Sequence, residues 1–108
     1  MIREKIAGHG CPLTNAMSTL GSKWKPVIVM VIGNKKLRFG QLFAIIGLIS
    51  RKVLTDQLRE LERDNILMRK EFKELPPRVE YRLTEKGLAL MPVLKLLEKW
   101  ERTYQRDK

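Results

Sequence analysis

Residues 39–61, FGQLFAIIGLISRKVLTDQLREL, give the strongest indication of the fold of this chain. Its first part has four apolar residues at the spacing i, i+3, i+4, i+7, which is that of one helix face: Phe39, Leu42, Phe43 and Ile46. Gly47 ends that helix, and Ser50 is an N-cap candidate for a second helix over residues 51–64. Two short helices joined by a tight turn with glycine are typical of a helix-turn-helix.

Two more helical patterns precede this pair. Ser22 is the N-cap candidate of the nearer one, which ends at Gly33 and is apolar nearly all round, so we expect it to form the buried centre of the fold. The earlier one begins at Pro12, ends at Gly21 and has a regular apolar face: Leu13, Ala16, Met17 and Leu20.

After the helix pair, the repeat of apolar residues changes from 3.6 residues, which is typical of a helix, to 2 residues, which is typical of a strand. Apolar and polar residues alternate over 66–73 and 78–84, on either side of Pro76 and Pro77, which predicts a β-hairpin. Thr84 is the cap candidate of a last helix to about Gln105, and we expect Pro92 to kink or break it. The order of elements predicts a mainly α chain with a small β-hairpin (α+β), a winged helix-turn-helix.

Length and composition narrow the class of protein. The 108 residues suffice for one domain, and 44% hydrophobic residues support a real core. We expect residues 1–10 to form a flexible arm and residues 11–108 to form the single domain. No apolar stretch approaches the ~20 residues that cross a bilayer, and no secretory pattern opens the chain. The sequence therefore predicts a cytoplasmic protein without a membrane partner.

Metal, cofactor and catalytic sites are not expected. One cysteine, Cys11, and one histidine, His9, exclude an internal disulfide framework and a metal cage of these residues. The sequence contains no nucleophile–base set, no carboxylate pair with a fixed role and no glycine loop for phosphate. We predict that the chain is no enzyme.

The charge favours a polyanionic partner. Lys and Arg number 22 against 12 Asp and Glu, a net charge of +10. Double-stranded DNA is the leading candidate, an anionic membrane surface is the second, and charge that only aids solubility is the third. The alternative function is a winged helix used for protein contact or dimerisation without DNA. Such a module usually lacks basic residues on the second helix of the pair and at the hairpin tip.

Leu54, Leu58 and Leu61 form the core-facing row of the helix over residues 51–64, so its outer face is the candidate DNA-reading surface. Six residues lie on this face or at its exposed N-terminal end: Ser50, Arg51, Lys52, Thr55, Asp56 and Arg59. In a major groove, Arg and Lys bond guanine and Thr contacts a thymine methyl, although any surface helix has a polar outer face. We expect Asp56 to read a cytosine amino group or to orient an arginine, and Glu60 to pair with a neighbouring arginine.

Further basic residues are candidates for contacts with the DNA backbone. Lys73 and Arg78 lie near the proline-containing tip of the hairpin, which predicts a wing along the phosphates or the minor groove. The plainer interpretation is that these charges protect edge strands. Lys36 and Arg38 precede the helix pair and are candidates for phosphate contacts, which set position rather than specificity.

The last helix is too apolar for one buried face. Val93, Leu97, Trp100 and Tyr104 form a stripe, and its exposure would invite aggregation. A two-fold dimer is the simplest resolution, and the alternative is that the stripe folds onto the core of its own chain. A two-fold dimer would place two reading helices about 34 Å apart and predicts a palindromic site.

Cys11 directly precedes Pro12 at the start of the first helix. There the positive end of the helix dipole favours a thiolate, which makes Cys11 a candidate for oxidation, electrophile capture or a disulfide to the partner subunit. The plainer alternative is a small apolar residue near the dimer seam.

Gly21-Ser22-Lys23-Trp24 is one of several motifs that match a known family, and the combination of Gly47-Leu48-Ile49-Ser50 with Pro76-Pro77-Arg78-Val79-Glu80-Tyr81 is highly specific. With these motifs the chain resembles the HxlR-type (DUF24) branch of the winged helix-turn-helix transcriptional regulators, near the MarR regulators. The resemblance implies a prokaryotic, cytoplasmic, DNA-binding homodimer, with recognition residues from Ser50 to Arg59 and a wing from Lys73 to Arg78.

The resemblance also implies a dimer joined through the first and last helices, which adds Leu13 and Met17 to the interface. In some members of that family, the cysteine at the place of Cys11 senses quinones, aldehydes, hypochlorite or disulfide stress. No second cysteine is present, so any disulfide must join two subunits or a small thiol. A small-molecule effector, the operator and the direction of regulation stay open.

Overall fold

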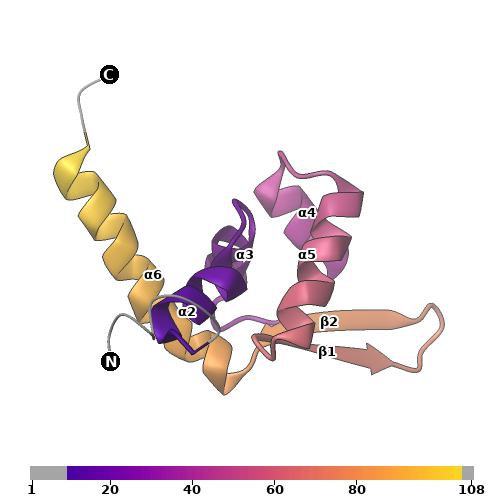
Figure 1. The fold of residues 1–108 in the computed structure, drawn as a ribbon. Coiled ribbons are helices and arrows are strands. Elements are labelled where there is room, and N and C mark those ends of the chain that lie inside the picture. Colours follow the sequence, from indigo (N-terminus) through magenta and orange to yellow (C-terminus); the bar gives the residue numbers. More distant parts are fainter. Residues whose placement is uncertain (1–9, 106–108) are drawn as a thin grey trace.

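The computed structural model describes residues 10–105 of the chain. Five helices and a two-stranded sheet follow one another in this part (Figure 1). Their bounds are α2 (Pro12–Leu20), α3 (Lys25–Ile32), α4 (Phe39–Ile46), α5 (Arg51–Arg63), β1 (Leu67–Phe72), β2 (Arg78–Leu83) and α6 (Glu85–Tyr104). The predicted fold class, mainly α with a small hairpin, is confirmed. Of the arm expected at residues 1–10, all but Gly10 lie outside the described residues, as does His9.

Helix α3 lies at the centre of the core, as its apolar sequence predicts. Ile28, Val29 and Ile32 have no exposed surface. Around them lie buried side chains from every later element: Leu37, Leu42, Ile49, Leu54, Leu58, Leu61, Ile66, Leu67, Leu83 and Leu94. Each such side chain contributes about 1.5–3 kcal/mol by leaving water. The helix pair α4–α5, the hairpin and the middle of α6 therefore share a single core.

The turn between α4 and α5 has the features that its sequence predicts. Gly47 has a φ of 79°, in the left-handed region that favours glycine, and its amide donates to the carbonyl of Phe43 at 3.0 Å. The Ser50 hydroxyl then accepts a hydrogen bond from the amide of Val53 at 3.1 Å. The Gly47 C-cap therefore ends α4 and the Ser50 N-cap begins α5 within four residues.

The hairpin extends beyond the helices, and its far end lies away from α6 (Figure 1). Its strands pair in antiparallel register from Leu67 opposite Leu83 to Phe72 opposite Arg78. Leu37 adds a bridge to Tyr81, with reciprocal backbone hydrogen bonds of 3.0 and 2.8 Å. This bridge ties the basic connection before α4 to the base of the wing.

Two expectations about helix ends and breaks differ from the structure. Helix α3 begins at Lys25 and its N-cap is Trp24, whereas Ser22 lies further upstream and accepts a hydrogen bond from the Lys25 amide at 3.1 Å. Helix α6 runs without a break through Pro92. Gly87 and Leu94, on either side of the proline, are both buried in the core, so packing holds the two halves in one helix.

Candidate nucleic-acid interface

Helix α5 presents its two faces as the sequence predicts. Leu54, Leu58 and Leu61 are at most 2% exposed and anchor the helix to the core. Ser50, Arg51, Lys52 and Arg59 are exposed, while Thr55 and Asp56 are half-buried. Around the helix axis, Lys52, Thr55, Asp56 and Arg59 therefore lie away from these leucines. Ser50 and Arg51 lie at the N-terminal end of the helix, next to the turn of the pair (Figure 1).

Two side chains at the start of α5 are held by neighbours. The Lys52 ammonium is 3.0 Å from a carboxylate oxygen of Asp56, one turn along the helix. The Arg51 guanidinium lies over the ring of Phe43, 4.4 Å from its centre. Asp56 thus orients a lysine, where we expected an arginine or a cytosine. The sequence analysis placed Phe43 on the inner face of α4 and therefore did not predict its contact with Arg51.

The two predicted wing cations, Lys73 and Arg78, differ in how exposed their side chains are. Lys73 is exposed near the tip, in agreement with a phosphate-contacting role. Arg78 stacks on Phe72 at 4.1 Å and forms an ion pair of 3.2 Å with Glu74, with Glu80 at 3.9 Å. The Arg78 side chain is only 28% exposed. The guanidinium therefore links the two strands, and Lys73 is the more exposed of the two predicted wing cations.

Lys36 and Arg38 lie on either side of Leu37 in the segment that bridges to β2. Leu37 is buried, and neighbouring side chains in an extended segment point to opposite faces. Lys36 and Arg38 consequently share the solvent face at the base of the wing, where both are exposed.

The predicted interface residues of α2 and α6 are exposed in the single chain. The exposed fraction ranges from 49% for Val93 to 73% for Tyr104, and the others lie between these values: Leu13, Met17, Leu97 and Trp100. Met17 and Leu97 line a groove of about 770 Å³ between α2, α3 and α6. The stripe on α6 thus does not fold onto the core of its own chain.

Cys11 is the N-cap of α2 and is buried. Its sulfur accepts a hydrogen bond from the Thr14 amide at 3.5 Å. Hydrogen bonds from Thr14 lower the pKa of the thiol below its ordinary value, against a smaller opposing effect of burial. The thiolate is therefore favoured at the position that the sequence singled out.

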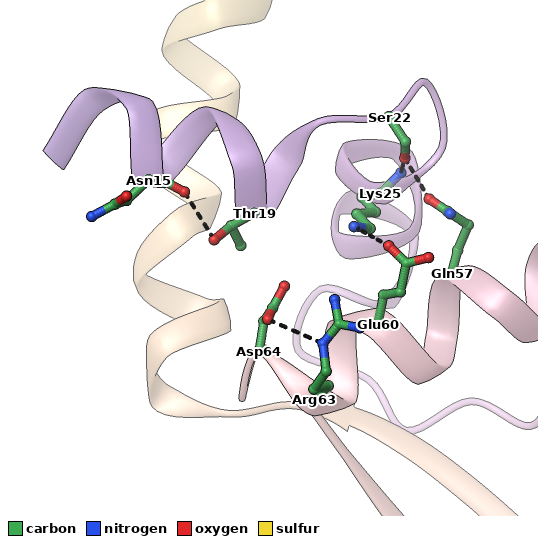
Figure 2. A network of polar contacts seen from close by, with 8 residues as sticks. All are labelled: Asn15, Thr19, Ser22, Lys25, Gln57, Glu60, Arg63 and Asp64. Carbon is green, nitrogen blue, oxygen red and sulfur yellow. Dashed lines mark hydrogen bonds and ion pairs between the residues drawn. The ribbon is translucent and has the colours of Figure 1, made fainter. Parts of the chain in front are cut away.

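The side chain of Glu60 has a partner that the sequence analysis missed. Glu60 pairs with Lys25 of α3 at 2.6 Å and not with a neighbouring arginine (Figure 2). The two residues are distant in sequence, so no local spacing could reveal the pair. The only indication of this pair in the sequence was the position of the Glu60 carboxylate, beside the row of buried leucines on α5.

Two kinds of feature are absent from residues 10–105. Within this range, no helix is long and apolar enough to cross a bilayer. Nor do three or more His, Cys, Asp or Glu side chains in it lie together as metal ligands would.

Known proteins are similar to this chain in both sequence and fold. MalR of Fusobacterium mortiferum, which carries the name of a regulatory protein, is 43% identical over 98 residues, or 90% of this chain and 92% of MalR. The reduced transcriptional regulator YodB of Bacillus subtilis superposes with a TM-score of 0.81 at 36% identity, covering 89% of this chain and 95% of YodB. YodB has also been solved after diamide treatment and with quinone bound. The redox regulator HypR in its oxidised form gives 0.81 at 37% identity, over 91% of this chain and all of HypR.

The family model described as "HxlR-like helix-turn-helix" matches residues 19–108. This range contains the complete helix-turn-helix, the wing and α6. The chain therefore belongs to the HxlR-like helix-turn-helix family of transcriptional regulators.

Proposed function

We propose that the chain acts as a homodimer that binds a two-fold symmetric operator through α5 and the wing. The observation that carries the proposal is the arrangement of α5, which has buried leucines on one side, exposed Lys52 and Arg59 on the other, and exposed Arg51 at its N-terminal end. This arrangement lets the helix enter a major groove while the body stays rigid. A regulator of this kind works in the prokaryotic cytoplasm, where the DNA is.

Contacts with base edges and contacts with phosphates come from different residues, as in other helix-turn-helix proteins. Arg51, Lys52 and Thr55 are assigned to base edges, and Lys73, Lys36 and Arg38 to phosphates. Arg78 supports the wing and contributes less to the backbone contacts, since its guanidinium is already paired with Glu74.

The exposed apolar stripe on α6 supports the dimer. Trp100 and Tyr104 are each more than half exposed, and the adjoining groove between α2, α3 and α6 is apolar in most of its lining. If a second copy packed its α6 against this surface about a two-fold axis, the apolar stripes of both copies would be buried. The same axis would set the two α5 helices about one turn of DNA, roughly 34 Å, apart.

Binding to DNA upstream of the chain's own gene, and to sites selected by the protein from a random duplex library, tests the proposal. We expect a salt-dependent anisotropy change and selection of a palindrome. Arg51→Ala should weaken operator binding by ~1–3 kcal/mol, because one base contact is lost. Selection of no motif from the library would refute sequence-specific binding, and parental affinity of Arg51→Ala would refute the role of that side chain.

We further propose that the Cys11 thiol switches DNA affinity. The support is its lowered pKa, its place at the N-cap of α2 next to the proposed interface, and the relatedness to HypR and YodB. With diamide as oxidant, two Cys11 thiols of a dimer would give up two protons and two electrons to form one disulfide, and the azo group of diamide would become a hydrazine.

Mass spectrometry and operator binding before and after diamide test this switch, with Cys11→Ser as the control. We expect the affinity of the parent to change and that of Cys11→Ser to stay constant. Equal affinity of the parent in both states, with oxidation confirmed by mass, would contradict the proposal.

A further inference from the structure

Four polar side chains join the start of α3 to the flank of α5 (Figure 2). The hydroxyl of Ser22 donates a short hydrogen bond to the amide oxygen of Gln57, and the Lys25 ammonium lies 2.6 Å from a carboxylate oxygen of Glu60. Ser22 also accepts a hydrogen bond from the Lys25 amide at 3.1 Å, which links the two pairs. We call these four residues, Ser22, Lys25, Gln57 and Glu60, the polar latch.

The position of Lys25 is unusual for a charged residue. Within residues 10–105 it is the one charged residue that is buried, and its side chain is 5% exposed. A buried ammonium needs a charged or strongly polar partner. Glu60 supplies that partner while its own side chain stays 38% exposed. The chain thus maintains a costly buried charge at the contact between α3 and α5.

The latch lies on the flank of α5 and not on its buried or outer face. At about 100° per residue, Gln57 and Glu60 lie roughly 60° and 120° from Leu54 around the helix axis. Arg59 lies on the opposite side, about 140° from Leu54. The latch therefore holds the helix at a point between the core and the surface that faces DNA.

Contacts of this kind fix the rotation of α5 better than leucines do. The leucine row of Leu54, Leu58 and Leu61 attaches the helix by non-directional burial, which tolerates small rotations. Hydrogen bonds and ion pairs tolerate little, because their distances vary by only about 0.5 Å. A rotation of about 10° moves a side chain at a radius of about 6 Å by about 1 Å, which is enough to break a base contact.

We infer that the polar latch sets the rotation of α5 on the body, so that Ser22 and Lys25 are positioning residues for operator recognition. The inference rests on the proposed function, since it concerns how the same helix reads DNA. It predicts that loss of the latch lowers selectivity for the operator while attraction to DNA of any sequence is kept. A merely stabilising role of the latch would leave that selectivity unchanged at temperatures where the protein is folded.

Two substitutions with the same charge change separate positioning from electrostatics. Glu60→Ala and Glu62→Ala each remove one negative charge from α5, but only Glu60 belongs to the latch and Glu62 is exposed. Long-range charge alone predicts that both variants bind DNA more tightly. The latch predicts that Glu60→Ala binds the operator at least tenfold more weakly than the parent, while Glu62→Ala binds at least as tightly. Both variants should bind an unrelated duplex equally well.

A double variant, Lys25→Met with Glu60→Met, covers the case in which Glu60→Ala fails to fold. Apolar residues of similar length replace a buried ion pair with little loss of stability, or with a gain. We expect this variant to melt near the parent and yet to lose at least tenfold in operator affinity, with no loss on the unrelated duplex.

The probes are a duplex that the parent selects from a random library and an unrelated duplex of equal length, both measured by anisotropy below the melting temperature. Parental operator affinity in either latch variant, with the parent itself selective, would overturn the latch alone. A parent that does not discriminate between the two duplexes would overturn the proposed function and this inference with it.

Discussion

The substitution Trp100→Ala tests the proposed dimer at a large aromatic residue of the exposed stripe on α6. Trp100 is 61% exposed in the single chain, and its only ring contact within residues 10–105 is with Tyr104, at 6.3 Å between centroids. With a total of about 250 Å² for a tryptophan, about 150 Å² faces solvent, worth about 4 kcal/mol per subunit at 25 cal/mol/Å². The substitution should leave the fold of the subunit intact.

A two-fold interface contains Trp100 twice, so the upper limit of the loss is about 8 kcal/mol. Alanine retains part of the contact and coverage by the partner is incomplete, so we expect about half of this, about 4 kcal/mol. That loss corresponds to a dimer dissociation constant raised about a thousandfold.

Sedimentation equilibrium over a range of protein concentrations measures the constant, and circular dichroism checks that the helices are retained. Leu75→Ala is the matched control, because Leu75 is fully exposed in the loop between β1 and β2, and this end of the hairpin lies away from α6 (Figure 1). It should dimerise like the parent. A dissociation constant of Trp100→Ala within threefold of the parent's would refute the assignment of the stripe to the interface.

Two further predictions concern charge. Lys73→Ala should weaken binding to all duplexes alike and reduce the slope of log affinity against log salt by about 1, whereas Arg78→Ala should change that slope less, because Arg78 is paired with Glu74; titrations at several salt concentrations measure both. The pKa of Glu60 lies below its ordinary value of 4.5, first through its hydrogen bond to Lys25 and then through the charge of Lys25. Since the folded pKa is the lower one, the Lys25–Glu60 pair stabilises the fold above pH 4.5, and this contribution is lost as the pH falls through the lowered value. Urea unfolding at pH 7 and pH 3 should show a smaller loss on acidification for Glu60→Gln than for the parent, and an equal loss would contradict the assignment.

Local signals in the sequence were sufficient to predict the elements. Ser50 and Thr84 cap α5 and α6 as expected, and Gly47 and Gly33 end α4 and α3. Each of these signals acts within four residues, so it is visible in a single sequence. The leucine row of α5 followed from its spacing for the same reason.

The partners of polar side chains could not be predicted in this way. Glu60 and Lys25 come from different helices, and their pairing depends on how α3 packs against α5. Arg78 looked like a free wing cation, yet Phe72 and Glu74 engage it only once the hairpin register is formed. Pro92 was expected to kink or break the last helix, because the local rule does not include the packing of Gly87 and Leu94 on both sides of it.

The distribution of charge argues for a division of labour between α5 and the wing. Helix α5 contains four basic and three acidic residues, so it contributes little of the net charge of +10. Most of the excess lies elsewhere, including the exposed Lys36, Arg38 and Lys73. A nearly balanced helix attracts DNA weakly, but acidic neighbours such as Asp56 hold its cations in fixed directions. Salt-dependent attraction should therefore depend on the wing and its base, and discrimination between sequences should depend on α5 and on the latch that orients it.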